Sequence, residues 1–230
     1  MAITNILPFS GIGNAQRRTP KINNYYVTIA IIDYGMGNLA SIANMIKKAG
    51  GKCSIVNNAE LLPMYDKVIL PGVGAFDTAI NNIKSNGLWD ALNKYALVDK
   101  KPVLGICLGM QLLCSQSEEG VEKGFGWIDA DVKKFNLKDS GLRIPHMGWN
   151  TINVQNQAFP LFKNTEEEQR FYFVHSYAVT CKKQENVAAT TNYGGDFDSV
   201  IWHDNIMGFQ CHPEKSHKFG LQIFKTFIEL

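Results

Sequence analysis

The chain has 230 residues, of which 45% are hydrophobic and 19% are charged, and its formal net charge is +2. That length allows one large domain with a substantial core. The small net charge creates no basic or acidic field of the kind that indicates binding to nucleic acid or to a membrane surface. No apolar run approaches the roughly 18 residues that a membrane span requires.

The cysteine content and the first 27 residues indicate the cellular compartment and the domain organisation. The five cysteines are odd in number and lack paired CxxC spacing. This pattern argues against a disulfide framework or a zinc ribbon and favours a reducing compartment, the cytoplasm. Residues 1–27 contain no Asp or Glu, and they lack the basic start and unbroken apolar core of a secretory signal. We expect an N-terminal extension over residues 1–27 and one domain over residues 28–230.

The first predicted strand, 28–33, leads into a glycine-rich turn, Gly35–Ala40, and then into an amphipathic helix. The turn matches the G-x-G-x-x-A pattern of dinucleotide-binding proteins. The next strand, 53–56, however ends in Asn57 and Asn58, where such proteins carry an acid for the ribose. Two interpretations stay open: a nicotinamide or flavin site, or a tight turn in which Asn38 caps the helix.

A further predicted strand, 68–70, ends in the glycine-bearing loop Pro71–Ala75. Loops at the carboxyl ends of parallel strands are where open α/β sheets bind ligands, although a plain turn has the same composition. Helices are predicted near 75–85 and 88–98, before another strand at 103–106. This alternation of strands and helices predicts a mostly parallel sheet with helices on both faces.

The strand at 103–106 runs into Gly105-Ile106-Cys107-Leu108-Gly109 and then into a helix-forming segment. This is the G-x-nucleophile-x-G elbow, with Cys107 at the nucleophile position. The glycines leave room beside a strained strand-to-helix turn, and the helix start directs N–H groups toward the sulfur, which favours thiolate. The alternative is that Cys107 is a small buried core residue, as most intracellular cysteines are.

The second half of the chain no longer shows alternating strands and helices. Short β-prone runs separated by turn signals occupy residues 127–128, 131–135, 151–154, 170–174, 177–180, 187–191, 199–203 and 206–210. A last amphipathic helix is predicted near 219–228. The predicted fold class is therefore α/β, with a single open, mostly parallel sheet, flanking helices and an added antiparallel or mixed β portion.

Among the five histidines, His212 is the candidate partner of Cys107. Pro213 favours an extended conformation at His212, and residues i and i+2 of an extended chain point to one side, so His212 and Glu214 can face one site. The carboxylate would then orient the imidazole toward a thiol. The alternative is a surface histidine beside an ion-pairing glutamate. Cys211 would point to the opposite face, and a zinc site lacks the required ligand spacing. His146 and His175 are expected to be structural or peripheral.

Several motifs together resemble one known family. The chain is similar to the class I, or triad, glutamine amidotransferases, and within them to the glutaminase subunits of imidazole glycerol phosphate synthases. The matching stretches cover the chain from about residue 28 onward and read IDYGMGN (32–38), LPGVGAF (70–76), LGICLGMQLL (104–113), SEEG (117–120), PHMGWN (145–150), YFVHSY (172–177) and HPEKS (212–216).

The resemblance implies hydrolysis of glutamine to glutamate and ammonia through a thioester, with no metal and no cofactor. It implies Cys107 as nucleophile, His212 as the base that later returns its proton, and Glu214 as the group that orients His212. Backbone N–H groups of Val73 and Leu108 would form the oxyanion hole. The positions matching the family's glutamine-binding residues are Gly74, Gln111, Ser176 and Tyr177.

The resemblance also implies a partner. In this family a cyclase subunit, a (βα)8 barrel, covers the glutaminase site as a heterodimer and receives the ammonia for making imidazole glycerol phosphate and AICAR in histidine biosynthesis. The positions that would face it are Asn38, Met147, Trp149, Tyr172 and Lys215, with Lys215 paired to an acid of the barrel.

Three alternatives remain open from the sequence. A paralogous glutaminase would feed ammonia to an amidotransferase that makes acetamidino surface sugars. A non-catalytic interaction module would bind a cyclase without hydrolysing glutamine. A dinucleotide-binding protein would use the turn at 35–40. The chain departs from the family pattern at Cys211, where Phe is usual, and in its N-terminal extension.

Overall fold

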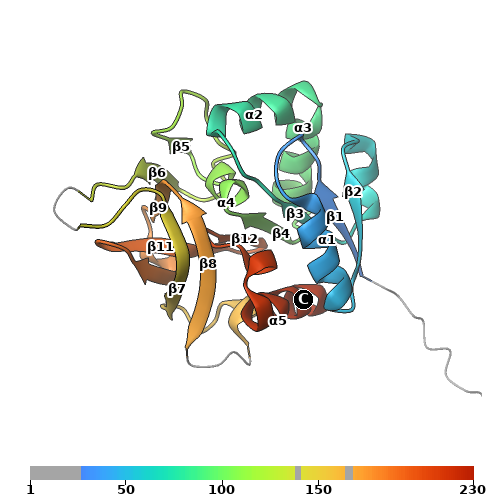
Figure 1. The fold of residues 1–230 in the computed structure, drawn as a ribbon. Coiled ribbons are helices and arrows are strands. Elements are labelled where there is room, and N and C mark those ends of the chain that lie inside the picture. Colours follow the sequence, from blue (N-terminus) through green and yellow to red (C-terminus); the bar gives the residue numbers. More distant parts are fainter. Residues whose placement is uncertain (1–26, 138–140, 164–167) are drawn as a thin grey trace, which may run out of the picture.

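The computed structural model describes residues 27–137, 141–163 and 168–230. Its centre is a run of five parallel strands in the order β2-β1-β3-β4-β12 (Figure 1). Their bounds are β1 Thr28–Ile32, β2 Lys52–Val56, β3 Lys67–Leu70, β4 Val103–Ile106 and β12 Ile206–Phe209. In β3, β4 and β12 every residue is buried, as expected for parallel strands that are covered on both faces.

The sheet continues beyond β12 through antiparallel pairs, in the order β11-β10-β7-β8 (Figure 1). Three further strands, β5, β6 and β9, attach beside β11. The bounds are β5 Gln116–Ser117, β6 Ala130–Lys134, β7 His146–Val154, β8 Gln169–His175, β9 Tyr177–Cys181, β10 Val187–Asn192 and β11 Asp196–His203. The predicted fold class is confirmed: a parallel α/β half is joined to an antiparallel portion.

The helices lie on both faces of the parallel half (Figure 1). On one face α1 (Leu39–Lys48) packs with α5 (His217–Glu229), and on the other α2 (Phe76–Ser85) packs with α3 (Leu88–Asn93) and α4 (Leu108–Leu112). Short helical segments cover Ala59–Met64, Lys94–Val98, Pro160–Phe162, Gln184–Asn186 and Pro213–Lys215 (η5). Each face has its own hydrophobic core.

Two sequence predictions of strands need correction. Trp127–Ile128 forms no strand, because both side chains turn into the core and the Trp127 Nε1–H donates to Asn93 Oδ1 at 2.8 Å. Strand β7 begins at His146 rather than at Thr151. Glycine and asparagine in PHMGWN weaken its β-propensity, and pairing with β8 from His146 onward overrides that preference.

Two further predictions concern the N-terminal part of the chain. One is confirmed, and the other falls on residues that the structure does not describe. Asn38 caps α1, since its Oδ1 accepts a hydrogen bond from the N–H of Ser41 at 3.2 Å. Apart from Val27, the predicted N-terminal extension lies outside the described residues. In the described part of the chain, no helix combines the length and the apolar character that crossing a membrane demands.

Candidate active site

Cys107 stands at a strained turn between β4 and α4. Its backbone has φ 54° and ψ −108°, in the half of the map that residues with a side chain rarely occupy. The flanking glycines are required by packing. A Cβ at Gly105 would lie 2.6 Å from the carbonyl oxygen of Gly109, and one at Gly109 would lie 1.8 Å from that of Leu70. The predicted elbow is therefore the observed local structure.

The sheet topology brings the second half of the chain to this turn. Strand β12 pairs in parallel with β4, and Phe209 is opposite Ile106. The N–H of Cys107 donates to the carbonyl of Phe209 at 2.8 Å. Both strands end at the same edge of the sheet, so His212 follows β12 where Cys107 follows β4.

His212 and Glu214 form a buried pair. Nδ1 of His212 lies 2.7 Å from Oε1 of Glu214, and the two side chains are 2% and 3% exposed. The expected extended conformation holds at His212 but is wrong for Glu214, because Pro213–Lys215 form the short helical segment η5. Proline disfavours a helical conformation in the residue before it and is well suited to the first helical position, so Pro213 produces this change of direction.

The electrostatics of the pair involve Cys107. Burial alone lowers the pKa of His212, but the electrostatic interactions with Cys107 and Glu214 outweigh burial and raise that pKa to about 9. The Nε2 atom of His212 is buried and makes no close conventional hydrogen bond to a described residue. The imidazole is therefore held by the carboxylate at Nδ1 and interacts electrostatically with Cys107, a set of groups that can act as nucleophile, base and orienting acid.

A cavity of about 340 Å³ opens beside the sulfur. That volume lies within the range of small-molecule sites. Seven residues predicted for the site line it together: Val73, Gly74, Cys107, Leu108, Gln111, Ser176 and Tyr177. They come from the loop after β3, from the elbow and α4, and from the turn between β8 and β9. His212 and Glu214 are not among the residues that line it.

Comparisons with known proteins agree with this geometry. The family model described as glutamine amidotransferase class-I matches residues 30–230. The chain belongs to the class I glutamine amidotransferase family. One relative, named imidazole glycerol phosphate synthase subunit HisH 2 of Pseudomonas aeruginosa, is 46% identical over 202 residues, which is 88% of this chain and 99% of that protein. The Methanococcus maripaludis protein of the same name is 51% identical over 203 residues, covering 87% and 98%.

Solved structures agree on the fold. The structure of PurLQS from Thermotoga maritima superposes with a TM-score of 0.70 at 18% sequence identity, covering 89% of this chain and 98% of that one. A crystal structure of a glutamine amidotransferase superposes with a TM-score of 0.69 at 16% identity, covering 88% and 99%. The protein is thus a glutamine amidotransferase by family, and its α/β architecture is that of the class.

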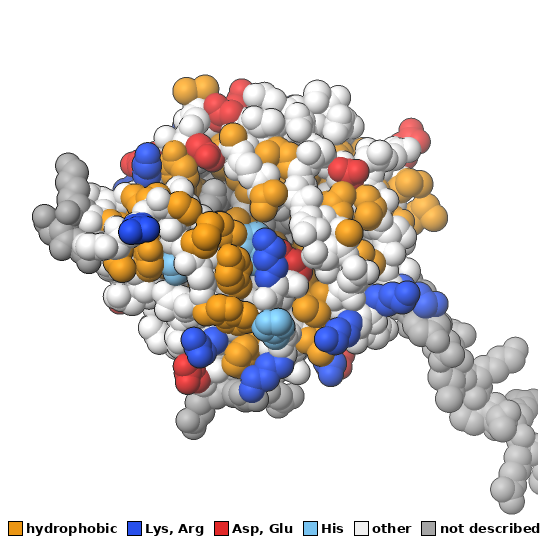
Figure 2. Space-filling model, viewed as in Figure 1, with side chains coloured by type: hydrophobic (Ala, Val, Ile, Leu, Met, Phe, Trp, Pro, Cys, Tyr) orange, Lys and Arg blue, Asp and Glu red, His pale blue; other side chains and the backbone are white. Residues whose placement is uncertain are grey.

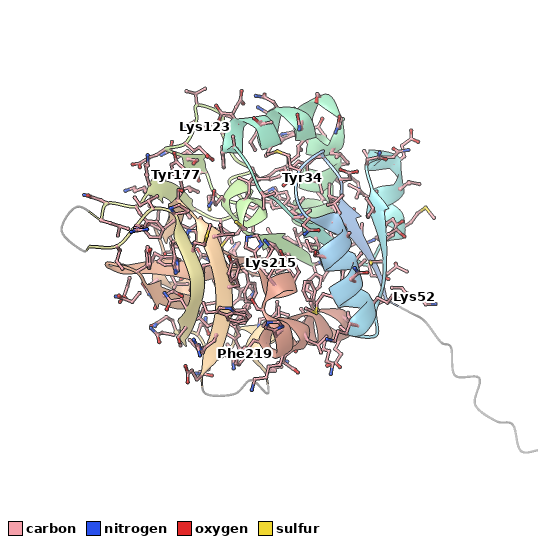
Figure 3. The ribbon with its side chains drawn as sticks, in the orientation of Figure 1. Tyr34, Lys52, Lys123, Tyr177, Lys215 and Phe219 are labelled. Carbon is pink, nitrogen blue, oxygen red and sulfur yellow. The ribbon has the colours of Figure 1, made fainter. Side chains whose placement is uncertain are left out.

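The loop that follows β3 packs closely against the elbow of this amidotransferase. A Cβ at Gly72 would lie 2.7 Å from the hydroxyl of Tyr34 and 2.8 Å from Cβ of Leu108, and the Tyr34 hydroxyl donates to the carbonyl of Pro71. In Figure 3, Tyr34 lies toward the parallel half of the molecule and Tyr177 toward the antiparallel portion. Gly74 has φ 121°, a conformation that suits glycine. The loop is therefore fixed at Gly72 while Val73 remains 44% exposed at the cavity.

Sequence reasoning missed three residues at this site. Glu119 and His175 line the cavity, and Gln210 lies behind the sulfur, with its Nε2 3.8 Å from Sγ of Cys107. Alternation along the extended chain before His212 could have found Gln210, which is two residues away. His175 was expected to be structural or peripheral. It is structural in its hydrogen bond to the Tyr177 carbonyl, at 2.7 Å from Nδ1, but it also reaches the cavity.

The remaining cysteines and histidines give no second reactive centre. Cys211 is fully buried in the hydrophobic core and burial raises the pKa of its thiol well above the ordinary value, so it stays neutral. Burial likewise lowers the pKa of His146 to about 4 and that of His175 to about 3. Within the described ranges no three metal-ligating side chains gather closely enough to hold a metal ion.

The residues predicted to face a partner are mostly exposed. Asn38 and Lys215 are exposed, Met147 is 62% exposed and Trp149 is 41% exposed, while Tyr172 is half-buried. Figure 3 shows Lys215 near the middle of the face in view, and its Nζ lies 5.8 Å from the ring centre of Tyr172. Hydrophobic side chains gather over β7 and β8 on the same face (Figure 2).

Proposed function

We propose that this amidotransferase is the glutaminase subunit of an imidazole glycerol phosphate synthase and hydrolyses glutamine to glutamate and ammonia for histidine biosynthesis. The observation that carries the proposal is the buried His212, which pairs with Glu214 and interacts with Cys107, while Cys107 lines a cavity together with the predicted glutamine-binding residues. The two HisH relatives with 46% and 51% identity support the choice of pathway.

The proposed first half-reaction forms a thioester. The sulfur of Cys107 attacks the side-chain amide carbon of glutamine, and its proton passes to Nε2 of His212. Glu214 accepts the Nδ1–H of His212 and stabilises the imidazolium. When the C–N bond breaks, His212 returns the proton and ammonia leaves. Acid–base help of this kind contributes about 10²–10⁴-fold.

The second half-reaction releases glutamate. Water replaces ammonia in the cavity, His212 takes a proton from it, and the resulting hydroxide attacks the thioester carbon. The C–S bond then breaks and the sulfur recovers the proton from His212. The tetrahedral oxyanion in both halves needs N–H donors, for which we propose Leu108 and Val73. Leu108 is the first residue of α4, where N–H groups lack intrahelical acceptors, and Val73 is in the loop against it.

Substrate binding follows from the cavity lining. Gly74, Gln111, Ser176 and Tyr177 are proposed to bind the amino-acid part of glutamine, which leaves the side-chain amide nearest the sulfur. Glu119 also lines the cavity, and its Oε2 accepts a hydrogen bond from the N–H of Phe76 at 2.9 Å. No step requires a cofactor.

The proposed partner is a cyclase subunit with a (βα)8 barrel, forming a heterodimer that channels ammonia. The support is the exposure of Asn38, Met147, Trp149 and Lys215, with the half-buried Tyr172 beside Lys215. No ion pair of Lys215 is formed within the described part of the chain, which suits pairing with an acid of the barrel. Trp149 and Met147 supply the apolar contact that protein interfaces favour.

The experiment measures glutamate released from glutamine by the chain alone and with a histidine-pathway cyclase carrying its nucleotide ligand. We expect low release alone and strong stimulation by the liganded cyclase. Release that the cyclase does not stimulate would contradict the pathway and direct the search to a surface-sugar amidotransferase. Absence of release, with normal binding of the cyclase, would support the non-catalytic interaction module.

A further inference from the structure

Gln210 is a fully buried side chain that lies between the sulfur and a residue of the substrate cavity. Its Oε1 lies 3.2 Å from Nε2 of Gln111, and its Nε2 lies 3.8 Å from Sγ of Cys107. Nε2 of Gln111 also lies 3.4 Å from the carbonyl oxygen of Tyr177. A carbonyl, two amides and the thiol thus form one continuous hydrogen-bonded chain inside the protein.

The direction of this chain is fixed at one end. A backbone carbonyl can only accept, so the group of Gln111 that faces Tyr177 must be its NH₂. That NH₂ can only donate, so the atom of Gln210 that faces it must be the oxygen. The NH₂ of Gln210 is then left for Cys107. Because the carbonyl oxygen of Tyr177 can only accept a hydrogen bond, the group of Gln210 that faces the sulfur is the NH₂ donor and not the oxygen acceptor.

The carbonyl of Tyr177 is itself held in place. His175 Nδ1 lies 2.7 Å from it, and His175 Nε2 lies 3.1 Å from Nδ1 of His146. His175 must donate from Nδ1 to a carbonyl, so its Nε2 accepts and His146 donates. Both histidines are then neutral with fixed tautomers. The acceptor that orients the two amides, the carbonyl of Tyr177 at the start of β9, is thus held by a histidine of β8 that is itself held by a histidine of β7.

From this geometry we infer that Gln210 is a further catalytic residue, which stabilises the thiolate of Cys107 by a hydrogen bond from its Nε2 and also holds Gln111 in the orientation that binds substrate. The reason is chemical. A donor favours the anionic sulfur over the thiol, whereas the other uncharged partner of the sulfur, the carbonyl of Val174 at 3.9 Å, favours the thiol.

The titratable groups around the sulfur are His212, Tyr34 and Cys211, and in addition Glu119 and His175 line the same cavity and Glu214 pairs with His212. Burial raises the pKa of both Tyr34 and Cys211, so neither carries a charge at neutral pH. His212 supplies the only positive charge among them, and it alternates between charged and neutral during the proposed reaction. Gln210 differs from it in being a donor that never loses its proton, so it supports the thiolate at every stage.

The inference rests on the proposed role of Cys107, but its test needs neither glutamine nor a cyclase. The rate at which iodoacetamide alkylates Cys107 is measured against pH, with mass spectrometry of the Cys107 peptide to separate it from the other cysteines. Gln210→Met removes both hydrogen bonds at similar size. Gln210→Glu retains an acceptor for Gln111 but places a negative charge near the sulfur.

We expect alkylation at about pH 7 to fall about tenfold in Gln210→Met and further in Gln210→Glu, because a hydrogen bond to a charged group has about this effect. At a pH where the thiol is fully ionised, both rates should approach that of the unmodified chain. Gln222→Met is the matched control. Its amide donates to Thr226 on α5, away from the sulfur, and its alkylation profile should not change.

If the Gln210 variants are alkylated at the same rate as the unmodified chain at every pH, the inference is overturned. It is also overturned by rates that are lower by the same factor at every pH, since that pattern reports altered access rather than a less stable thiolate. Thermal unfolding of each variant confirms that it folds. Glutamate release in the presence of the cyclase is measured separately, so loss of the proposed function in the unmodified chain remains distinguishable from failure of this inference.

Discussion

Ile106 and Phe209 lie opposite each other on the neighbouring parallel strands β4 and β12. One residue further on, the N–H of Cys107 donates to the carbonyl of Phe209 at 2.8 Å. This register determines where the segments that follow β4 and β12 leave the sheet relative to each other. A shift by one residue would turn Gln210 away from the sulfur, because side chains alternate along a strand. Sheet pairing, rather than any contact between the catalytic side chains, therefore assembles the site.

Glu214→Gln should lower kcat for glutamine hydrolysis by about 10²–10⁴-fold while the chain folds normally. The amide preserves the shape of the side chain but cannot stabilise an imidazolium through Nδ1. Steady-state glutamate release with the cyclase measures the effect. Glu185→Gln, at an exposed position, should retain full activity. Retention of activity in Glu214→Gln would exclude the proposed orienting role.

The pKa of His212 predicts how stability depends on pH. Because the folded-state pKa is raised to about 9 from the ordinary 6.5, the stabilisation by protonated His212 is complete below about pH 6.5. It should disappear as the pH rises through about 9. The measurement is urea unfolding of the unmodified chain and of His212→Asn across this range. The difference between the two should shrink with rising pH, and a difference that stays constant would contradict the assignment.

The pair His146 and His175 predicts the opposite dependence at acid pH. Their pKa values of about 4 and 3 lie below the ordinary value, so the folded chain binds fewer protons than the unfolded chain. Their stabilisation is complete above about pH 6.5 and should be lost as the pH falls through about 4 and 3. His146→Phe should weaken this loss in an unfolding series. His203→Phe, at an exposed position, provides the comparison.

Gly109→Ala should destabilise the chain by at least about 3 kcal/mol, because the new Cβ would lie 1.8 Å from the backbone oxygen of Leu70 and neither backbone can move freely. Gly87→Ala is the matched control. Gly87 has φ 69° and open space around it, so only the left-handed backbone strain of about 1 kcal/mol applies. Equal losses in the two variants, by chemical denaturation, would show that the elbow is not closely packed.

Trp149→Ala should weaken binding of the cyclase by about tenfold or more, since exposed aromatic residues at the centre of an interface often dominate affinity. Titration of labelled cyclase measures the dissociation constant. Met64→Ser tests specificity, because Met64 is 74% exposed but belongs to the segment Ala59–Met64, remote from the predicted interface set. A similar dissociation constant for both variants and the unmodified chain would place the partner surface elsewhere.

The sequence predicts the parallel half well because its signals are local. Buried apolar runs, glycine turns and the elbow at Cys107 each reside in a few adjacent residues. It does not predict that β12 returns to lie in parallel beside β4, since no local pattern encodes a partner strand about a hundred residues away. Alternation before His212 places Gln210 on the same side of the chain, but a local pattern predicts neither the partners of Gln210 nor those of His175. Their role depends on contacts with α4 and β7, which only the folded chain brings together.

The central position of β12 has a consequence for how the protein is made. A ribosome extrudes β4 long before β12, yet β12 must enter between β4 and β11. During synthesis the edge of β4 is therefore open, and Cys107 has neither Gln210 nor His212 beside it. The thiol of the nascent chain therefore lacks both of these neighbouring side chains. If Cys107 has the proposed role, we expect its thiol to become reactive only when the returning strand completes the sheet, so that a nascent chain does not hydrolyse glutamine.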